Sequence, residues 1–162
     1  MVDVTEIAAI VAAAGVLAGV VYYVLDIRNQ GKMRQTDLVF RLYSAFSGKE
    51  LQEAYFAVMT LEFKDYDDFM KRYAGMPAVP MVQLLAQVTK FFDGMGVLLS
   101  RKLADIGLVD DLFRTEVIRL WEKVRPIAEG RRKELNQPTY AKSFEFLYNE
   151  LKNREINGVK NG

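Results

Sequence analysis

Apolar residues occupy the chain without a break from Ile7 to Leu25, and no charged side chain interrupts these 19 positions. A helix of that length rises roughly 28 Å at about 1.5 Å per residue, close to the ~30 Å hydrocarbon core of a bilayer. The apolar residues cover every face of such a helix, whereas a surface helix carries one apolar stripe. The alternative is a core helix buried inside a folded protein. We predict a single N-terminal transmembrane helix.

Charged residues flank this run unevenly. Two acidic residues precede it, Asp3 and Glu6. Four basic residues follow it: Arg28, Lys32, Arg34 and Arg41. Basic flanks stay in the cytoplasm, so we predict a single-pass protein of the cell membrane with its N-terminus outside and its C-terminal domain cytoplasmic. In that arrangement Arg28, Lys32 and Arg34 would contact the lipid headgroups at the membrane surface.

Four small residues recur along the apolar run: Ala8, Ala12, Gly15 and Gly19. They are spaced by four, three and four positions, so they share one helical face. Small side chains let two helix backbones approach closely in a membrane. The stripe predicts helix–helix association, and hence a homodimer formed through the transmembrane helix.

Beyond the run, apolar residues recur three and four positions apart as far as Leu151, which is the helical period. No segment sustains the alternation of apolar and polar residues that a strand requires. The predicted fold is therefore all-α, a single N-terminal transmembrane helix followed by a compact multi-helix bundle. We divide the chain into an anchor with its flank (1–30), a cytoplasmic all-helical domain (31–153) and a flexible tail (154–162).

Turn and capping residues predict where the helices of the domain begin and end. Ser47-Gly48 should end one helix, and Asp65 should cap a short one. Pro80 suits the first turn of a long helix.

The same signals continue toward the C-terminus. Asp110 or Asp111 should cap the next helix, in which Pro126 predicts a kink or a break. Pro138 or Thr139 should start the last helix.

The composition excludes several kinds of site. The chain has no cysteine and no histidine, which excludes disulfides, cysteine zinc sites and a Ser–His–Asp triad. Lys plus Arg total 22 and Asp plus Glu total 21, so the net charge of +1 gives no field that would attract nucleic acid. No P-loop, GxGxxG or GxSxG motif is present. We therefore predict no catalytic residue, no metal site, no cofactor and no nucleic-acid partner, which favours a protein that is not an enzyme.

Two glycines interrupt the longest apolar stripe of the domain, in the run Asp93-Gly94-Met95-Gly96. A glycine inside a helix costs about 1 kcal/mol relative to alanine. Such a cost is explained when another helix backbone, or a ligand, approaches closely. Asp93 could then hydrogen-bond a neighbouring helix end or the indole N–H of Trp121. Asp93, Gly94, Gly96 and Trp121 are therefore our candidate special site, with close packing as the simpler interpretation.

Four segments carry a resemblance to a known family: Asp26-Ile27-Arg28 at the exit of the anchor, the run FFDGMGVL at 91–98, the helix around Trp121 with Arg125-Pro126, and Phe144-Glu145-Phe146-Leu147-Tyr148. In these segments the chain resembles a family of short bacterial and archaeal proteins that is grouped as a domain of unknown function. The resemblance implies a membrane-attached protein with a small all-α domain. It implies no activity and no catalytic residues.

Three functional hypotheses follow. The first is a membrane-anchored interaction, adaptor or regulatory module without catalytic activity, whose protein partner the sequence does not identify. The second is a membrane-tethered small-ligand binder or enzyme that uses Asp93. The third is a soluble helical protein whose first helix is buried in an oligomer.

Overall fold

The computed structural model describes the backbone of residues 4–74 and 80–160, and the side chains of residues 15–73 and 81–154. Within these residues the chain forms six α-helices and no strand, which confirms the predicted all-α class. The helices, together with one π-helical turn η1, are α1 (Val4–Phe46), α2 (Lys49–Met59), α3 (Tyr66–Phe69), η1 (Met70–Ala74), α4 (Pro80–Ser100), α5 (Ile106–Glu134) and α6 (Lys142–Lys160).

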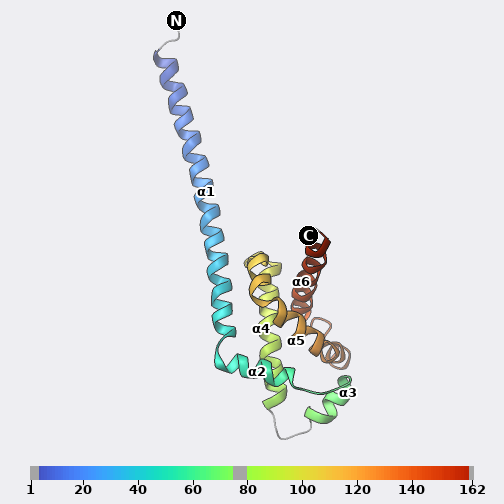
Figure 1. Ribbon diagram of the computed structural model, residues 1–162. Coiled ribbons are helices and arrows are strands. Elements are labelled where there is room, and N and C mark those ends of the chain that lie inside the picture. The colour runs from blue at the N-terminus through green and yellow to red at the C-terminus, as the bar shows by residue number, and fades with distance from the viewer. Residues whose placement is uncertain (1–3, 75–79, 161–162) are drawn as a thin grey trace.

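Helix α4 lies at the centre of the bundle (Figure 1). It packs against α6 along much of its length and against α2 near its start, while α5 contacts α6, α3 and α1. Aromatic rings form the middle of the core. Phe92 stacks on Phe144 with ring centroids 5.3 Å apart, and Trp121 meets Phe144 edge-on at 5.0 Å. These three side chains are at most 1% exposed, so the contact between α4, α5 and α6 is dry.

Several helix ends lie where local signals predict them. Helix α1 ends at Phe46, directly before Ser47-Gly48, and α4 begins at Pro80. Asp65 caps α3, because its Oδ1 accepts a hydrogen bond from the backbone N–H of Asp68 at 2.8 Å. In each case the signal acts through atoms within one helical turn.

Helix α5 corrects the predicted N-cap and excludes one of the two alternatives predicted for Pro126, the break. Its N-cap is Asp105, whose Oδ1 accepts from the N–H of Leu108 at 2.8 Å, and not Asp110 or Asp111. Asp110 instead accepts a hydrogen bond from Arg114 at 2.6 Å. Pro126 does not break the helix, which runs on to Glu134. Proline removes one backbone hydrogen bond. Burial of the residues around it, Val124, Ile127 and Ala128, offsets that loss.

The last helix also begins later than predicted, at Lys142 instead of Pro138 or Thr139. Ala141 has a positive φ of 52°, which is incompatible with a helix that starts before it. Arg132 holds this turn by donating to the backbone oxygens of Tyr140, at 2.8 Å, and Ala141, at 3.3 Å. The backbone of α6 then continues to Lys160, and so includes residues 154–160 of the segment that we expected to be a tail.

Helix α1 is a single helix of 43 residues. It passes through residues 30 and 31, where the sequence placed the division between anchor and domain, without a break. Among the residues with described side chains, no helix is both long enough and apolar enough to cross a membrane. This finding overturns the predicted transmembrane anchor and the single-pass location in the cell membrane. The described apolar part of α1, residues 15–25, extends only about 16 Å before Asp26 and Arg28 follow.

A second close helix contact lies between α3 and α5. A Cβ atom at Gly130 would overlap the ring of Tyr66, so only glycine fits there. The Tyr66 hydroxyl donates to Glu134 Oε2 at 2.7 Å. Burial, followed by this hydrogen bond and the charge of Glu134, raises the pKa of Tyr66 from 10.0 to about 12.

This raised pKa predicts a pH dependence of stability. The folded state binds the phenol proton more tightly than the unfolded state, so the contribution is complete below pH 10 and is lost as pH rises toward about 12. Subtracting the tyrosinate absorbance of Tyr66→Phe from that of the wild type isolates the titration of Tyr66. We expect the midpoint of this difference curve near the raised pKa of about 12. In Glu134→Gln the midpoint should move back toward 10.0. A difference curve centred at 10.0 in the wild type would contradict the contact.

Candidate functional site

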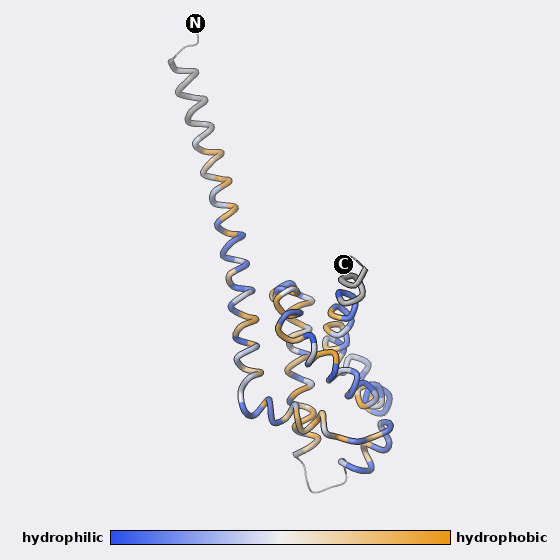
Figure 2. The backbone as a smooth tube through the Cα atoms, in the orientation of Figure 1, coloured by the Kyte–Doolittle hydropathy of each residue, from blue (hydrophilic) through white to orange (hydrophobic). Residues whose placement is uncertain are grey.

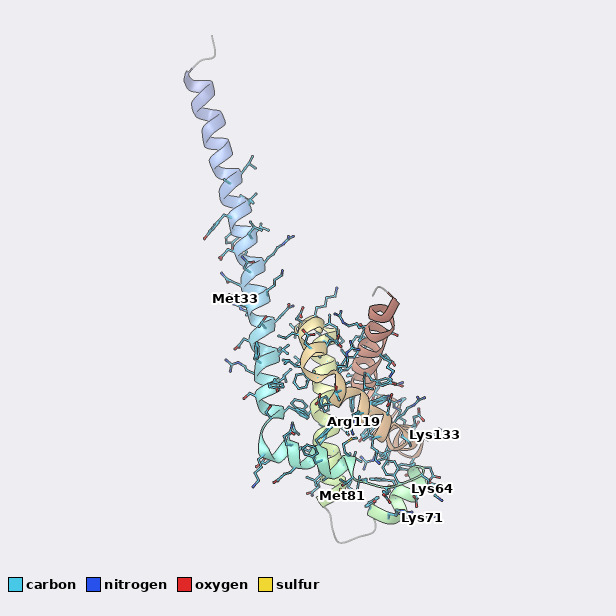
Figure 3. All side chains as sticks on the ribbon, in the orientation of Figure 1. Met33, Lys64, Lys71, Met81, Arg119 and Lys133 are labelled. Carbon is cyan, nitrogen blue, oxygen red and sulfur yellow. The ribbon has the colours of Figure 1, made fainter. Side chains whose placement is uncertain are left out.

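The N-terminal half of α1 extends away from the bundle (Figure 1). Among the described residues, the hydrogen bond nearest the N-terminus that joins α1 to the rest of the domain runs from Gln35 Nε2 to the backbone oxygen of Lys102, at 2.7 Å. Every residue from Gly15 to Arg34 is exposed. We call residues 15–34 the projecting segment. Met33, labelled in Figure 3, marks its lower end.

The projecting segment carries many bulky apolar side chains. Figure 2 shows hydrophobic residues, in orange, along the upper part of this segment. Their exposed fractions range from 43% at Val24 to 74% at Tyr22. The residues are Val16, Leu17, Val20, Val21, Tyr22, Tyr23, Val24, Leu25, Ile27 and Met33. A contiguous apolar surface of this kind normally marks a place where another molecule binds.

Four of these side chains form a stripe on one face: Leu17, Val20, Val21 and Val24. Their spacing is i, i+3, i+4, i+7, the pattern of a helix face that packs against a neighbour. Eighteen residues later the same pattern recurs at Gln35, Leu38, Val39 and Leu42. Gln35, Val39 and Leu42 contact the bundle, and Leu38 is half-buried. Eighteen residues are about five turns, so the two sets lie on the same side of the helix. The face that packs against the bundle thus continues past it, uncovered.

The predicted small-residue stripe lies on a different side. Gly15 lies two positions before Leu17, and Gly19 lies two positions before Val21. Two positions correspond to about 200° around the helix axis, so the glycines face away from the stripe. A Cβ atom at either glycine would meet nothing within 4 Å. Ala8 and Ala12 lie outside the residues whose side chains are described. Helix pairing through these four positions stays a prediction.

The three basic residues after the apolar run, Arg28, Lys32 and Arg34, are exposed on the projecting segment. Their predicted contact with lipid headgroups depended on the anchor. It loses its basis with the correction of the anchor.

The residues predicted around Asp93 mostly gather at the start of α6. Asp93 Oδ1 accepts a hydrogen bond from the backbone N–H of Phe144 at 2.9 Å, so a side chain of α4 caps α6. A Cβ atom at Gly96 would overlap the backbone carbonyl of Ser143, so the two helix backbones touch there. Gly94 is different, because a Cβ atom on it would meet open space.

Trp121 lies on the other side of Phe144 and makes no hydrogen bond to Asp93 among the described side chains. Its ring packs against Phe144, and the guanidinium of Arg132 lies 5.9 Å from its centroid. Asp93, Gly96 and Trp121 therefore surround one point, the first turn of α6. The pairing of Asp93 with a neighbouring helix end favours a packing role. Among the described residues, no group of three acidic side chains is placed to hold a metal ion.

Comparison with known families matches residues 9–151 to the domain of unknown function DUF4760. The chain belongs to this family. The match confirms the resemblance to a family of unknown function, and it begins inside α1 and ends at Leu151 of α6. The DUF4760 region therefore includes the projecting segment as well as the bundle. No curated protein and no solved structure matches the chain.

Sequence reasoning overlooked one feature of the DUF4760 chain, the stripe shared by the two halves of α1. Residues 7–25 are so uniformly apolar that they showed no preferred face. The sequence did contain a signal for this stripe, because the mainly apolar pattern i, i+3, i+4, i+7 that starts at Leu17 recurs eighteen residues later, from Gln35. It becomes visible only when the second half of α1 is known to pack against a bundle.

Proposed function

We propose that this DUF4760 chain is a non-catalytic interaction module that pairs with a second copy of itself through the stripe of Leu17, Val20, Val21 and Val24. The observation that supports the proposal most directly is the continuation of the bundle-packing face of α1 onto an exposed segment. The chain itself supplies an apolar face of matching length and chemistry. Pairing would bring two helical bundles to the two ends of one helix pair.

The free energy from apolar burial is comparable to the cost of association. Each stripe side chain is about half exposed, between 43% and 66%. Burial of this exposed part against a second copy contributes about 1 kcal/mol per side chain. Eight side chains from two copies contribute roughly 8 kcal/mol, within the range of about 4–15 kcal/mol that association costs. The neighbouring Val16 and Ile27 add to this sum. We expect a reversible, concentration-dependent dimer.

The position of the bundle favours an antiparallel pair. The stripe faces the same side as Val39 and Phe46, and the bundle already covers that side of the lower half of α1, leaving these two residues at most 5% exposed. In a parallel pair the lower half of the partner helix would have to occupy the same space as the bundle. In an antiparallel pair the lower half of the partner helix points away from the bundle.

Charge supports the same orientation. The sequence places Asp3 and Glu6 before the apolar run and Arg28, Lys32 and Arg34 after it. An antiparallel pair puts the basic end of one helix opposite the acidic end of the other. A parallel pair would put six basic side chains next to one another.

The bulky stripe is also a better interface in water than the small-residue stripe. In lipid, helices associate through close packing of small residues, because burial of apolar area gives no gain there. In water, the area of bulky side chains drives association. Leu17 and Val24 offer that area, whereas Gly15 and Gly19 offer almost none.

Sedimentation of the full chain over a range of concentrations tests the proposal. We expect the wild type to form dimers and Val24→Asp to remain monomeric, because the aspartate would have to be buried in the interface. The matched control is Tyr22→Asp, which places the same charge two positions away on the opposite side of the helix and should leave the dimer intact.

Two results would overturn the proposal. One is a wild type that stays monomeric at every concentration. The other is loss of the dimer in Gly15→Leu/Gly19→Leu but not in Val24→Asp, which would assign the interface to the small-residue stripe. Because all these positions lie beyond the last contact with the bundle, thermal unfolding of the bundle should be the same in each variant and serves as a check on folding.

A further inference from the structure

A cavity of about 390 Å³ lies beside the first turn of α6. Its walls come from α4, the end of α5 and the connection between α5 and α6. The polar side chains in these walls are Thr89, Lys90, Asp93, Arg131, Thr139 and Tyr140. The volume falls within the range of about 300–1,000 Å³ that is typical of small-molecule sites.

Two cations line the cavity without a carboxylate partner. Neither Lys90 nor Arg131 forms an ion pair with any described side chain, and the Arg131 guanidinium rests 5.5 Å from the centroid of the Tyr140 ring. The next residue, Arg132, is already engaged, because its Nη1 lies 3.1 Å from Glu145 Oε2. Lys90 and Arg131 are therefore free to bind an anion.

Among the described residues, Asp93 is the single acidic side chain in the cavity wall. Its Oδ1 is occupied by the N–H of Phe144, so its charge faces the positive end of the α6 dipole. Two cations and one carboxylate leave a net charge of +1 on the wall. That balance suits a ligand with a single negative charge better than a dianion.

Thr89 adds a hydroxyl to the cavity wall. The residue as a whole is 5% exposed, and its hydroxyl takes no part in the hydrogen bonds among the described residues. Its oxygen remains accessible, since Asp110 Oδ1 is the one buried side-chain oxygen without a partner in the described part of the chain. The Thr89 hydroxyl can therefore donate a hydrogen bond to a ligand in the cavity.

The wall opposite α4 is held rigidly. Arg132 binds the backbone oxygens of Tyr140 and Ala141, and Ala141 keeps its left-handed backbone conformation, φ 52°. Glu145 anchors Arg132 and also pairs with Lys142 at 2.8 Å. A site whose walls are fixed in this way loses little entropy when a ligand binds.

We propose that this cavity binds a small organic carboxylate. The carboxylate lies between Lys90 and Arg131 and accepts a hydrogen bond from the hydroxyl of Thr89. The apolar body of the ligand packs against Ala86 and the ring of Tyr140. This site is separate from the stripe on α1 and does not depend on self-association.

Amide NMR spectra of the full chain, titrated with hexanoate, test the assignment. We expect saturable shifts at the amides of Thr89, Ala141 and Phe144. Hexylamine, which has the same apolar body and the opposite charge, should give none at equal concentration. Inorganic phosphate should shift the same amides more weakly, since it lacks the apolar body and carries more charge.

Three variants make the test specific. Arg131→Gln should weaken hexanoate binding roughly tenfold, because it removes a charge-assisted hydrogen bond. Thr89→Val keeps the shape of the side chain, removes its hydroxyl and should also weaken binding. Lys133→Gln, which removes an exposed positive charge two residues further along α5, is the matched control and should bind like the wild type (Figure 3).

The proposal is overturned if hexanoate gives no saturable shift, or if hexylamine shifts the same amides equally. Equal weakening in Arg131→Gln and Lys133→Gln would also overturn it, because that result would mean general attraction to a positive surface. Val24→Asp, which is designed to be monomeric, should bind hexanoate like the wild type.

Discussion

Gly96→Ala should destabilise the folded chain by about 3 kcal/mol, the upper part of the usual range for overpacking a core. A Cβ atom at this position would overlap the backbone carbonyl of Ser143 in the first turn of α6. A backbone group cannot rotate away as a side chain can, so α6 would have to move. That movement would also stretch the hydrogen bond between Asp93 and Phe144, now 2.9 Å long.

Gly94→Ala is the matched control for this variant. It is the same change in the same turn of α4, but the added Cβ meets nothing within 4 Å. Because alanine favours a helix over glycine, we expect this variant to be more stable than the wild type by about 0.5–1 kcal/mol. Urea unfolding followed by circular dichroism measures both. If the two variants unfold at the same urea concentration, the close contact of α4 and α6 is wrong.

Phe46→Ala should destabilise the chain by about 3–5 kcal/mol, the usual cost of removing a buried phenylalanine. Phe46 is 5% exposed and joins the end of α1 to three other helices. Four aromatic rings lie with centroids 5.4–5.8 Å from its own: Tyr55, Phe91, Phe92 and Phe113. Truncation leaves a cavity at the point where α1 joins the bundle. The loss is a large part of the about 5–15 kcal/mol that stabilises a typical domain.

Phe56→Ala provides the comparison on the adjoining helix. Phe56 is 61% exposed and its ring contacts that of Tyr55. We expect its truncation to cost less than about 1 kcal/mol, as for other surface substitutions. Amide hydrogen exchange would add a local reading, because loss of Phe46 should speed exchange in residues 35–46 of α1. Equal stability of the two variants would contradict the central place of Phe46 in the core.

The two proposals concern different ends of the molecule. Each corresponds to one of the hypotheses that the sequence left open. Pairing through α1 corresponds to the idea of a first helix buried in an oligomer, with the bundle as the part that each copy presents. The cavity beside Asp93 corresponds to the idea of a small-ligand binder. In the structure Asp93 holds α6 in place, and Lys90, Arg131 and Thr89 are the groups available to a ligand.

Local signals in the sequence determined much of the fold. The helical period of the apolar residues established the all-α class, and Asp65, Pro80 and Ser47-Gly48 marked helix ends correctly. These signals act within one turn of the chain, so they do not depend on the rest of the molecule. The cost of glycine inside a helix likewise directed attention to Gly94 and Gly96. It did not distinguish them, because the two differ only in what lies opposite.

The remaining features depend on residues far apart in the chain, and only the tertiary structure decided them. Asp93 and Phe144 are 51 positions apart, yet they form the cap of α6. Asp110, which the sequence offered as the cap of α5, lies inside that helix and accepts a hydrogen bond from Arg154, 44 positions away. The apolar run of α1 could not be assigned a packing side until the bundle covered the lower half of the same helix. Periodicity shows that a helix has an apolar face, but only packing against distant residues shows which part of that face is left uncovered.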